Sequence, residues 1–175
     1  YNNGETCIAA KRFVVVDSVY DKFRDLVIEK FNSYKVGDPM EKSTDVGPMS
    51  SSKQRDTLHK QVQESVDKGA TITIGGEVPD KPGAFYPPTI LENIKPDQPA
   101  YKDELFGPVA ALIRAKDQDD AFRIANDSRY GLGGAIFSKD EEKAINLAQK
   151  HFDTGMVYIN GYNLVNPGLP FGGVK

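Results

Sequence analysis

The single cysteine of the chain is the residue best suited to covalent chemistry. Cys7 follows a polar turn that contains Gly4 and precedes the small and aliphatic run Ile-Ala-Ala, where we expect a helical turn to begin. A thiol at the start of a helix gains from the positive end of the helix dipole, which favours the thiolate. The sequence therefore indicates a nucleophile at position 7. Burial as a small hydrophobic residue is the alternative, because free cysteines are commonly buried.

The two histidines, His59 and His151, are not placed to activate this cysteine. We expect His59 on a polar stretch of one helix and His151 in the last turn of another, where a cation suits the negative end of the dipole. Both are interpreted as surface or capping residues, so a papain-like Cys-His hydrolase is not favoured. One cysteine and two histidines do not form a Cys/His zinc site, and no metal is expected.

Two apolar turns could present side chains to a ligand. An acid and an aromatic, Glu104 and Phe106, stand in Glu-Leu-Phe-Gly-Pro-Val just before a predicted strand. Residues in such rigid turns commonly carry function. The second turn is Leu-Pro-Phe-Gly-Gly at 169–173, and Asn160 precedes it at the end of another strand. Packing of a loop is the alternative interpretation of both turns.

The usual nucleotide-binding fingerprints are missing. Gly131-Leu-Gly-Gly resembles the start of G-x-G-x-x-G, but the third glycine would fall on Ile136, and the run precedes a strand instead of following one. We interpret it as a tightly packed turn. If the protein uses a dinucleotide, most of the binding surface lies outside this chain.

The pattern of apolar residues predicts an α/β fold. Strands are expected at 12–16, 71–74, 85–91, 109–115, 133–137 and 156–160, and helices at 18–34, 52–68, 118–126 and 140–151. In the first helix, Ser18 with Asp21 three residues on would form the N-cap pair, and Gly37-Asp38-Pro39 would end the element. Its inward face would carry Val19, Phe23, Leu26, Val27, Phe31 and Tyr34.

Three further expectations concern the connections between these elements. Gly69 would occupy the C′ position of the second helix. Pro87-Pro88 would make 85–91 an edge or irregular strand. The β-α-β-α-β order after residue 108 predicts an open, mostly parallel sheet with flanking helices, which is a Rossmann-like arrangement.

Composition fits a soluble globular domain. The 175 residues are 39% hydrophobic and 27% charged, and the formal net charge of −3 provides no positive field for nucleic acid or an anionic membrane. We expect neither partner. A lone cysteine suggests a reducing, cytoplasmic location. The first residue is not methionine, and we expect the chain to be a piece of a longer protein.

Five motifs, in order, resemble the aldehyde dehydrogenase superfamily. They are Asn3-Gly-Glu-Thr-Cys7, Glu104-Leu-Phe-Gly-Pro-Val109, Asn126-Asp127 with Tyr130-Gly-Leu132, Gly155-x-Val-x-Ile-Asn160, and Pro170-Phe-Gly-Gly-Val-Lys175. Within that superfamily the runs Cys7–Phe13, Val36–Met40 and Phe85–Leu91 are most similar to bacterial NAD(P)-dependent succinate-semialdehyde dehydrogenases.

This resemblance implies that 1–175 is the catalytic domain of a longer enzyme, without its coenzyme-binding domain and oligomerisation strand. Cys7 would attack a small-molecule aldehyde as thiolate and form a thioester. Glu104 would hold the nicotinamide ribose of NAD or NADP, and Phe106 would lie beside the nicotinamide. Asn160, Pro170, Phe171 and Gly172 would support the active site. The intact enzyme would be a homodimer or homotetramer, and this chain alone would be inactive.

The sequence also departs from the family pattern. Residue 5 is Glu where the family usually has Gln, and a carboxylate there could disfavour the thiolate. Tyr1 and Val165 stand where enzymes dedicated to succinate semialdehyde often have an Arg and a Ser for the substrate carboxylate. A thiol hydrolase that needs no coenzyme and a non-catalytic α/β interaction module are the alternative functions.

Overall fold

The computed structural model describes residues 2–162 and 167–175. The chain forms two compact units, Tyr1–Asp117 and Gln118–Lys175. The expectation that all 175 residues make one catalytic domain stays a prediction. Among the described residues, none of the helices has both the length and the apolar character needed to cross a membrane.

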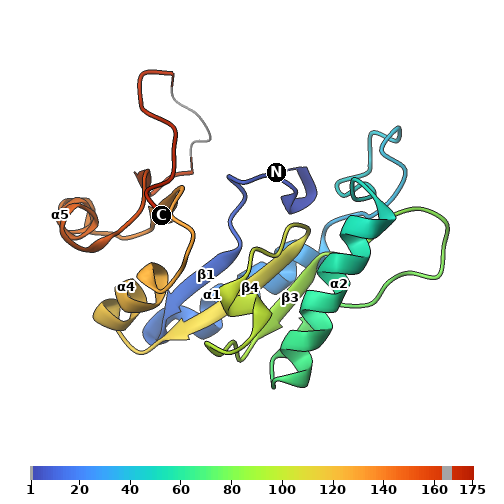
Figure 1. Ribbon diagram of the computed structural model, residues 1–175, viewed down its shortest axis with the longest axis horizontal. Helices are drawn as coiled ribbons and strands as arrows, with labels where there is room; N and C mark the ends of the chain where they lie inside the picture. The colour runs from blue at the N-terminus through green and yellow to red at the C-terminus, as the bar shows by residue number, and fades with distance from the viewer. Residues whose placement is uncertain (1, 163–166) are drawn as a thin grey trace. The chain divides into compact units, whose positions relative to one another are not determined.

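The first unit is built on a four-stranded sheet with the strand order β1-β4-β3-β2 (Figure 1). The central strand β4 (Val109–Ala115) lies parallel to β1 (Arg12–Val16) and to β3 (Thr89–Glu92), while β2 (Thr71–Ile74) is antiparallel to β3. The first five residues of β4 are buried. A strand covered on both faces needs such a continuous apolar run.

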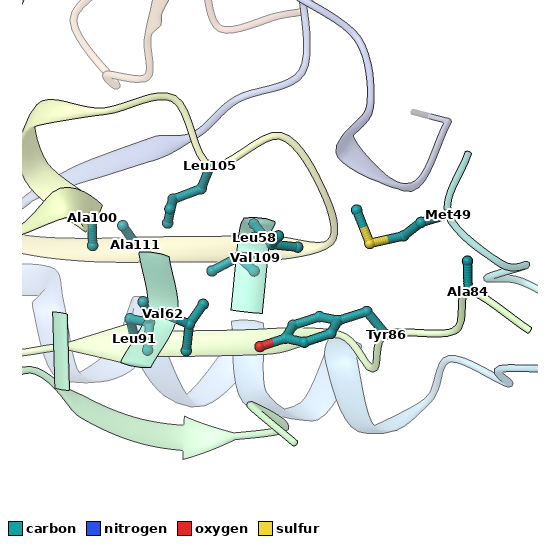
Figure 2. Close-up of a cluster of buried hydrophobic side chains, with 10 residues drawn as sticks. All are labelled: Met49, Leu58, Val62, Ala84, Tyr86, Leu91, Ala100, Leu105, Val109 and Ala111. Carbon is teal, nitrogen blue, oxygen red and sulfur yellow. The ribbon is translucent and has the colours of Figure 1, made fainter. Parts of the chain in front are cut away.

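Two long helices, α1 (Asp17–Asn32) and α2 (Ser52–Asp67), cover opposite faces of this sheet. Successive residues of a strand point to opposite faces. Ala110 and Leu112 accordingly join a cluster with residues of α1, whereas Val109 and Ala111 join a cluster with residues of α2. Figure 2 shows the second cluster, in which Leu58 and Val62 of α2 lie over β3 and β4.

The predicted ends and inward face of α1 were partly wrong. The helix begins at Asp17 after Val16, which makes no side-chain cap, so Ser18 lies inside it. It ends at Asn32, several residues before the predicted glycine-proline stop. Tyr20, Phe23, Val27, Ile28 and Phe31 face the sheet. Their spacing fits one helical stripe. Val19 and Leu26 are instead 50% and 56% exposed.

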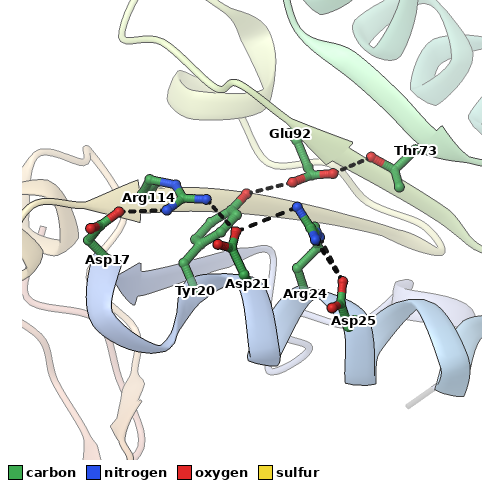
Figure 3. Close-up of polar contacts among 8 residues, drawn as sticks. All are labelled: Asp17, Tyr20, Asp21, Arg24, Asp25, Thr73, Glu92 and Arg114. Carbon is green, nitrogen blue, oxygen red and sulfur yellow. Dashed lines mark hydrogen bonds and ion pairs between the residues drawn. The ribbon is translucent and has the colours of Figure 1, made fainter.

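Hydrogen bonds and ion pairs connect α1 to the sheet (Figure 3). Arg114, the exposed residue of β4, donates to Asp17 at 2.5 Å and to Asp21 at 2.6 Å. The Tyr20 hydroxyl donates to the Glu92 carboxylate of β3 at 3.0 Å. Burial, followed by this hydrogen bond, raises the pKa of Tyr20 well above its ordinary value.

The segment between α2 and β4 confirms one prediction and corrects another. Gly69 has a φ of +93° directly after the C-cap Lys68, as the C′ position requires. The edge or irregular strand predicted at 85–91 begins only at Thr89, after both prolines. It is an internal strand, and its pairing with β2 is irregular between Ile72 and Ile74. Proline lacks the backbone donor that a ladder needs, so pairing starts after it. A short helix, α3 (Pro99–Lys102), was not predicted.

The second unit contains α4 (Gln118–Asn126), β5 (Gly134–Ile136), α5 (Glu141–His151) and β6 (Val157–Ile159). These elements agree with the predicted ones to within one residue at each end. Asp140 caps α5 by accepting from the backbone N–H of Lys143 at 2.9 Å. β5 and β6 pair in parallel as a two-stranded sheet. The α/β class with a mostly parallel, open sheet and flanking helices is confirmed, although the described strands form two sheets and not one.

Candidate active site

Cys7 lies on an exposed turn that begins with left-handed backbone. The 3-10 turn η1 (Asn2–Gly4) contains three successive residues with positive φ, at 48°, 53° and 77°. Asparagine and glycine are the residues that tolerate this region. A further turn follows, closed by the Ala9 N–H donating to the Thr6 carbonyl at 3.1 Å. The prediction of a helix start at Cys7 was therefore wrong: the chain passes from this turn into β1 within a few residues.

The turn that carries Cys7 is docked against the loop before α2. The Asn3 side-chain amide donates to the carbonyl oxygens of Gly47 and Pro48, each at 3.1 Å. The Glu5 carboxylate accepts from the backbone N–H of Ser50 at 3.0 Å and from its hydroxyl at 2.6 Å. Glu5 thus has a structural partner, and its carboxylate is directed to Ser50.

On another side the same turn meets the 104–107 turn. The backbone of Gly4 is so close to Gly107 that a Cβ at position 4 would collide with the Gly107 carbonyl. Gly107 is itself packed on α2, where a Cβ would overlap Leu58 and lie 2.9 Å from Met49. Two glycines in contact therefore let the two turns approach at backbone distance.

Helix α2 supports the 104–107 turn through its side chains. Gln54 donates from its amide to the Phe106 carbonyl at 3.0 Å, and Gln61 donates to the Glu104 carbonyl at 3.4 Å. Leu105 points into the core and is 1% exposed. Because the backbone is held and Leu105 is buried, the side chains of Glu104 and Phe106 remain partly exposed.

Lys11 links these groups, although nothing in its sequence context marks it as a site residue. Its ammonium nitrogen donates to the Gly4 carbonyl and lies 4.6 Å from the centroid of the Phe106 ring. Burial lowers the pKa of Lys11, while the nearby Glu104, Cys7 and Glu5 oppose that shift. A lysine just before a strand looks like an ordinary surface charge, so only the tertiary contacts reveal its position.

The structure brings the predicted residues Cys7, Glu104 and Phe106 together in the first unit, around Lys11. The predicted supporting residues lie in the second unit. Asn160, at a φ of 50°, accepts from the Ser138 N–H and donates to the Ser138 carbonyl, both at 2.8 Å, and so fixes the loop before α5.

The C-terminal turn carries the other predicted supporting residues. Pro170 and Phe171 are exposed, and the Gly172 carbonyl is so close to Gly155 that a Cβ on Gly155 would overlap it. Tyr1 and Val165, which stand where the resemblance places residues for a substrate carboxylate, lie outside the described residues.

The histidines lie in structural contacts. The Nδ1 atom of His59 is 3.3 Å from the Tyr86 hydroxyl, and their rings meet edge to face. His151 is exposed, and its ring centroid lies 6.1 Å from that of Phe122. The exposure of His151 agrees with its interpretation as a surface or capping residue, whereas His59 is partly buried against Tyr86.

The chain is similar to known proteins along its whole length. The model of the aldehyde dehydrogenase family matches residues 1–175. A succinate-semialdehyde dehydrogenase [NADP(+)] of Deinococcus radiodurans is 49% identical over 99% of the chain, and one of Mycobacterium avium is 45% identical over the same share. The chain spans only 36% and 37% of these two relatives.

Solved structures agree with the sequence relatives. The succinic semialdehyde dehydrogenase of Streptococcus pyogenes, solved with NADP+, matches all of the chain at 42% identity and a TM-score of 0.95. Betaine aldehyde dehydrogenase of Staphylococcus aureus, solved with NAD+, matches it at 34% identity and a TM-score of 0.94. The chain covers 38% and 35% of those two chains.

Proposed function

Because the chain belongs to the aldehyde dehydrogenase family, we propose that the protein containing it oxidises an aldehyde to a carboxylic acid through Cys7. The observation that carries this proposal is the exposed thiol of Cys7 on a turn packed against the Glu104–Gly107 turn. A surface thiol held by a rigid backbone is positioned to add to a carbonyl carbon.

The proposed chemistry at Cys7 proceeds in two stages. The thiolate sulfur forms a bond to the aldehyde carbon, and the carbonyl oxygen becomes an oxyanion. When the oxyanion re-forms a carbonyl, the aldehyde hydrogen leaves with its electron pair as hydride and a thioester remains on Cys7. Water then breaks the carbon–sulfur bond, giving the acid and returning the thiol. The resemblance assigns the oxyanion-binding Asn and the Glu that activates water to positions outside this chain.

The coenzyme we propose is NADP+ or NAD+, which accepts the hydride when it is bound. The residues present fit its nicotinamide ribose end: Glu104 offers a partly exposed carboxylate to hydroxyl donors, and Phe106 offers a partly exposed ring. Relatives named for NADP+ support that form of the coenzyme. Most of the binding surface would lie in a domain outside this chain.

Succinate semialdehyde is the proposed substrate, supported by the names of several relatives at 42–49% identity. We further propose that the protein acts in the cytoplasm, where an exposed thiol such as Cys7 stays reduced, and that it assembles as a homodimer or homotetramer. Light scattering on the full-length protein measures the assembly, and a monomer would contradict it.

The test measures coenzyme reduction by the full-length protein with succinate semialdehyde and with butanal, which has the same chain length but no carboxylate. We expect reduction of NADP+ with succinate semialdehyde. Its kcat/KM should be at least about tenfold higher than that of butanal, because a paired carboxylate would stabilise the bound substrate. Equal kcat/KM values for the two aldehydes would contradict the proposal that succinate semialdehyde is the substrate. Ester cleavage without any aldehyde oxidation would favour the cofactor-independent thiol hydrolase, and inactivity on both would favour the interaction module.

A further inference from the structure

Lys11 makes two contacts that join separate parts of the candidate site. Its ammonium donates a hydrogen bond to the Gly4 carbonyl, in the turn that leads to Cys7, and it lies over the Phe106 ring at 4.6 Å. The first contact is with the turn that carries the proposed nucleophile, Cys7. The second contact is with a residue that we propose to lie beside the coenzyme. A charge-assisted hydrogen bond and a cation–π contact are both stronger when they are partly desolvated.

The surroundings of Lys11 are consistent with a charge held in place. The side chain is partly buried, and burial is the main cause that lowers its pKa. The groups that face it are Glu104 in the 104–107 turn, and Cys7 and Glu5 in the preceding turn, all of which favour the ammonium form. Glu5 is directed to Ser50 by its hydrogen bonds, which leaves Glu104 and Cys7 as the functional neighbours.

We propose that Lys11 is a positioning residue that holds the Cys7 turn and the Phe106 ring in a fixed relation and keeps a positive charge beside the thiol. It acts through these neighbours and is not itself a reactant. The inference rests on the proposed function of Cys7 and Phe106, and it deepens that function by adding the group that connects them.

The test compares Lys11→Met and Lys11→Arg in the full-length protein. Methionine keeps the length and the apolar stem but removes the charge, whereas arginine keeps the charge. Lys81→Met is the matched control, because the Lys81 ammonium also lies over a phenylalanine, Phe85 at 3.8 Å, outside the site.

The first readout needs neither aldehyde nor coenzyme. The rates of alkylation of Cys7 by anionic iodoacetate and by neutral iodoacetamide are measured from the mass of the Cys7 peptide. A nearby cation attracts the anionic reagent. We therefore expect the ratio of the iodoacetate rate to the iodoacetamide rate to fall about two- to fivefold in Lys11→Met, and to be retained in Lys11→Arg and Lys81→Met.

The second readout is the dissociation constant of NADP+, measured by fluorescence titration at several pH values. We expect Lys11→Met to weaken binding about tenfold, with Lys11→Arg recovering most of the loss. Because its pKa is lowered, Lys11 loses its proton at a lower pH than an ordinary lysine does. The affinity of the wild type for NADP+ should therefore decline as the pH rises through that lower range. The affinity of Lys11→Met should not show this decline.

An unchanged alkylation ratio together with unchanged coenzyme affinity in Lys11→Met would overturn the proposal. A lower melting temperature alone, with both readouts at wild-type values, would assign Lys11 to folding and would overturn it as well. If the wild-type protein oxidises no aldehyde, the proposed function fails, yet the alkylation ratio still reports whether Lys11 places its charge beside Cys7.

Discussion

Gly4 and Gly107 are in backbone contact, and this contact joins the turn that carries Cys7 to the turn that bears Glu104 and Phe106. A Cβ on Gly4 would overlap the Gly107 carbonyl, and Gly4 has a φ of +77°. A side chain is disfavoured both by this positive φ and by the short distance to the Gly107 carbonyl. The distance between the proposed nucleophile and the proposed coenzyme contacts therefore depends on the absence of a single methyl group.

Gly4→Ala should weaken the site more than the fold. We expect a loss of about 1–3 kcal/mol in the free energy of unfolding, because alanine is strained at positive φ and must displace the Gly107 carbonyl. Aldehyde oxidation by the full-length protein should fall at least about 100-fold, since misplacement by about 1 Å has that effect. Urea unfolding and steady-state kinetics measure the two effects.

Gly133→Ala is the matched control, because Gly133 lies outside these two turns and an added Cβ there makes only ordinary contacts with Met156, the nearest at 3.4 Å. Wild-type rates in both variants would show that the contact between Gly4 and Gly107 does not set the geometry of the site.

Leu58→Ala should destabilise the first unit strongly. Leu58 is 0% exposed and lies under Gly107. The lost burial and the cavity together should lower the free energy of unfolding by about 2–5 kcal/mol. Leu26→Ala, at a position of α1 that is 56% exposed, should change it by less than about 0.5 kcal/mol. Similar values for the two variants in chemical denaturation would contradict the placement of Leu58.

The hydrogen bond from Tyr20 to Glu92 should give stability an alkaline dependence. The pKa of Tyr20 is raised above its ordinary value of 10.0 by burial and by Glu92. The hydrogen bond therefore stabilises the fold fully below about pH 10. Its contribution declines as the pH rises above the pKa that Tyr20 has in the unfolded chain.

Tyr20→Phe should lower the free energy of unfolding by about 1–2 kcal/mol at pH 8. It should also lose less stability than the wild type between pH 9 and about pH 11. Tyr34→Phe, which removes a hydroxyl outside this contact, is the control. Parallel pH dependences of urea unfolding in wild type and Tyr20→Phe would show that Tyr20 does not titrate as described.

Glu104→Gln should weaken coenzyme binding without disturbing the turn, because the Glu104 contact with Gln61 uses the backbone carbonyl. We expect a rise of about tenfold in the dissociation constant of NADP+, from loss of a charged acceptor for the ribose hydroxyls. Calorimetry on the full-length protein measures it. Unchanged affinity would remove Glu104 from the proposed coenzyme contacts.

Elements with a strong local signal were predictable from the sequence. β4 and α4 occupy their predicted bounds, because a continuous apolar run and a clear helical stripe each specify one structure. The start of α1 was wrong, since a Ser-x-x-Asp pattern resembles a cap wherever it occurs. The division of the strands into two sheets is a tertiary property that the order of elements does not contain.

Sequence motifs predicted which residues belong to the candidate site, but not the contacts that surround these residues. Cys7, Glu104 and Phe106 could be proposed as site residues because their neighbours form recognisable runs. The support of Cys7 was misread as a helix start, whereas the structure holds it by glycine contact and by the side chain of Asn3. Lys11 could not be found, because its contacts with Gly4 and Phe106 depend on how β1 and the 104–107 turn meet in space.

The most direct test of the account is to capture the acyl group on Cys7. Full-length protein is mixed with succinate semialdehyde and NADP+, quenched with acid, and digested for mass spectrometry of the Cys7 peptide. We predict that this peptide gains the mass of a succinyl group, and that Cys7→Ala lacks both the adduct and aldehyde oxidation while its melting temperature is close to that of the wild type. Steady aldehyde oxidation by Cys7→Ala, at a rate near that of the wild type, would contradict the account.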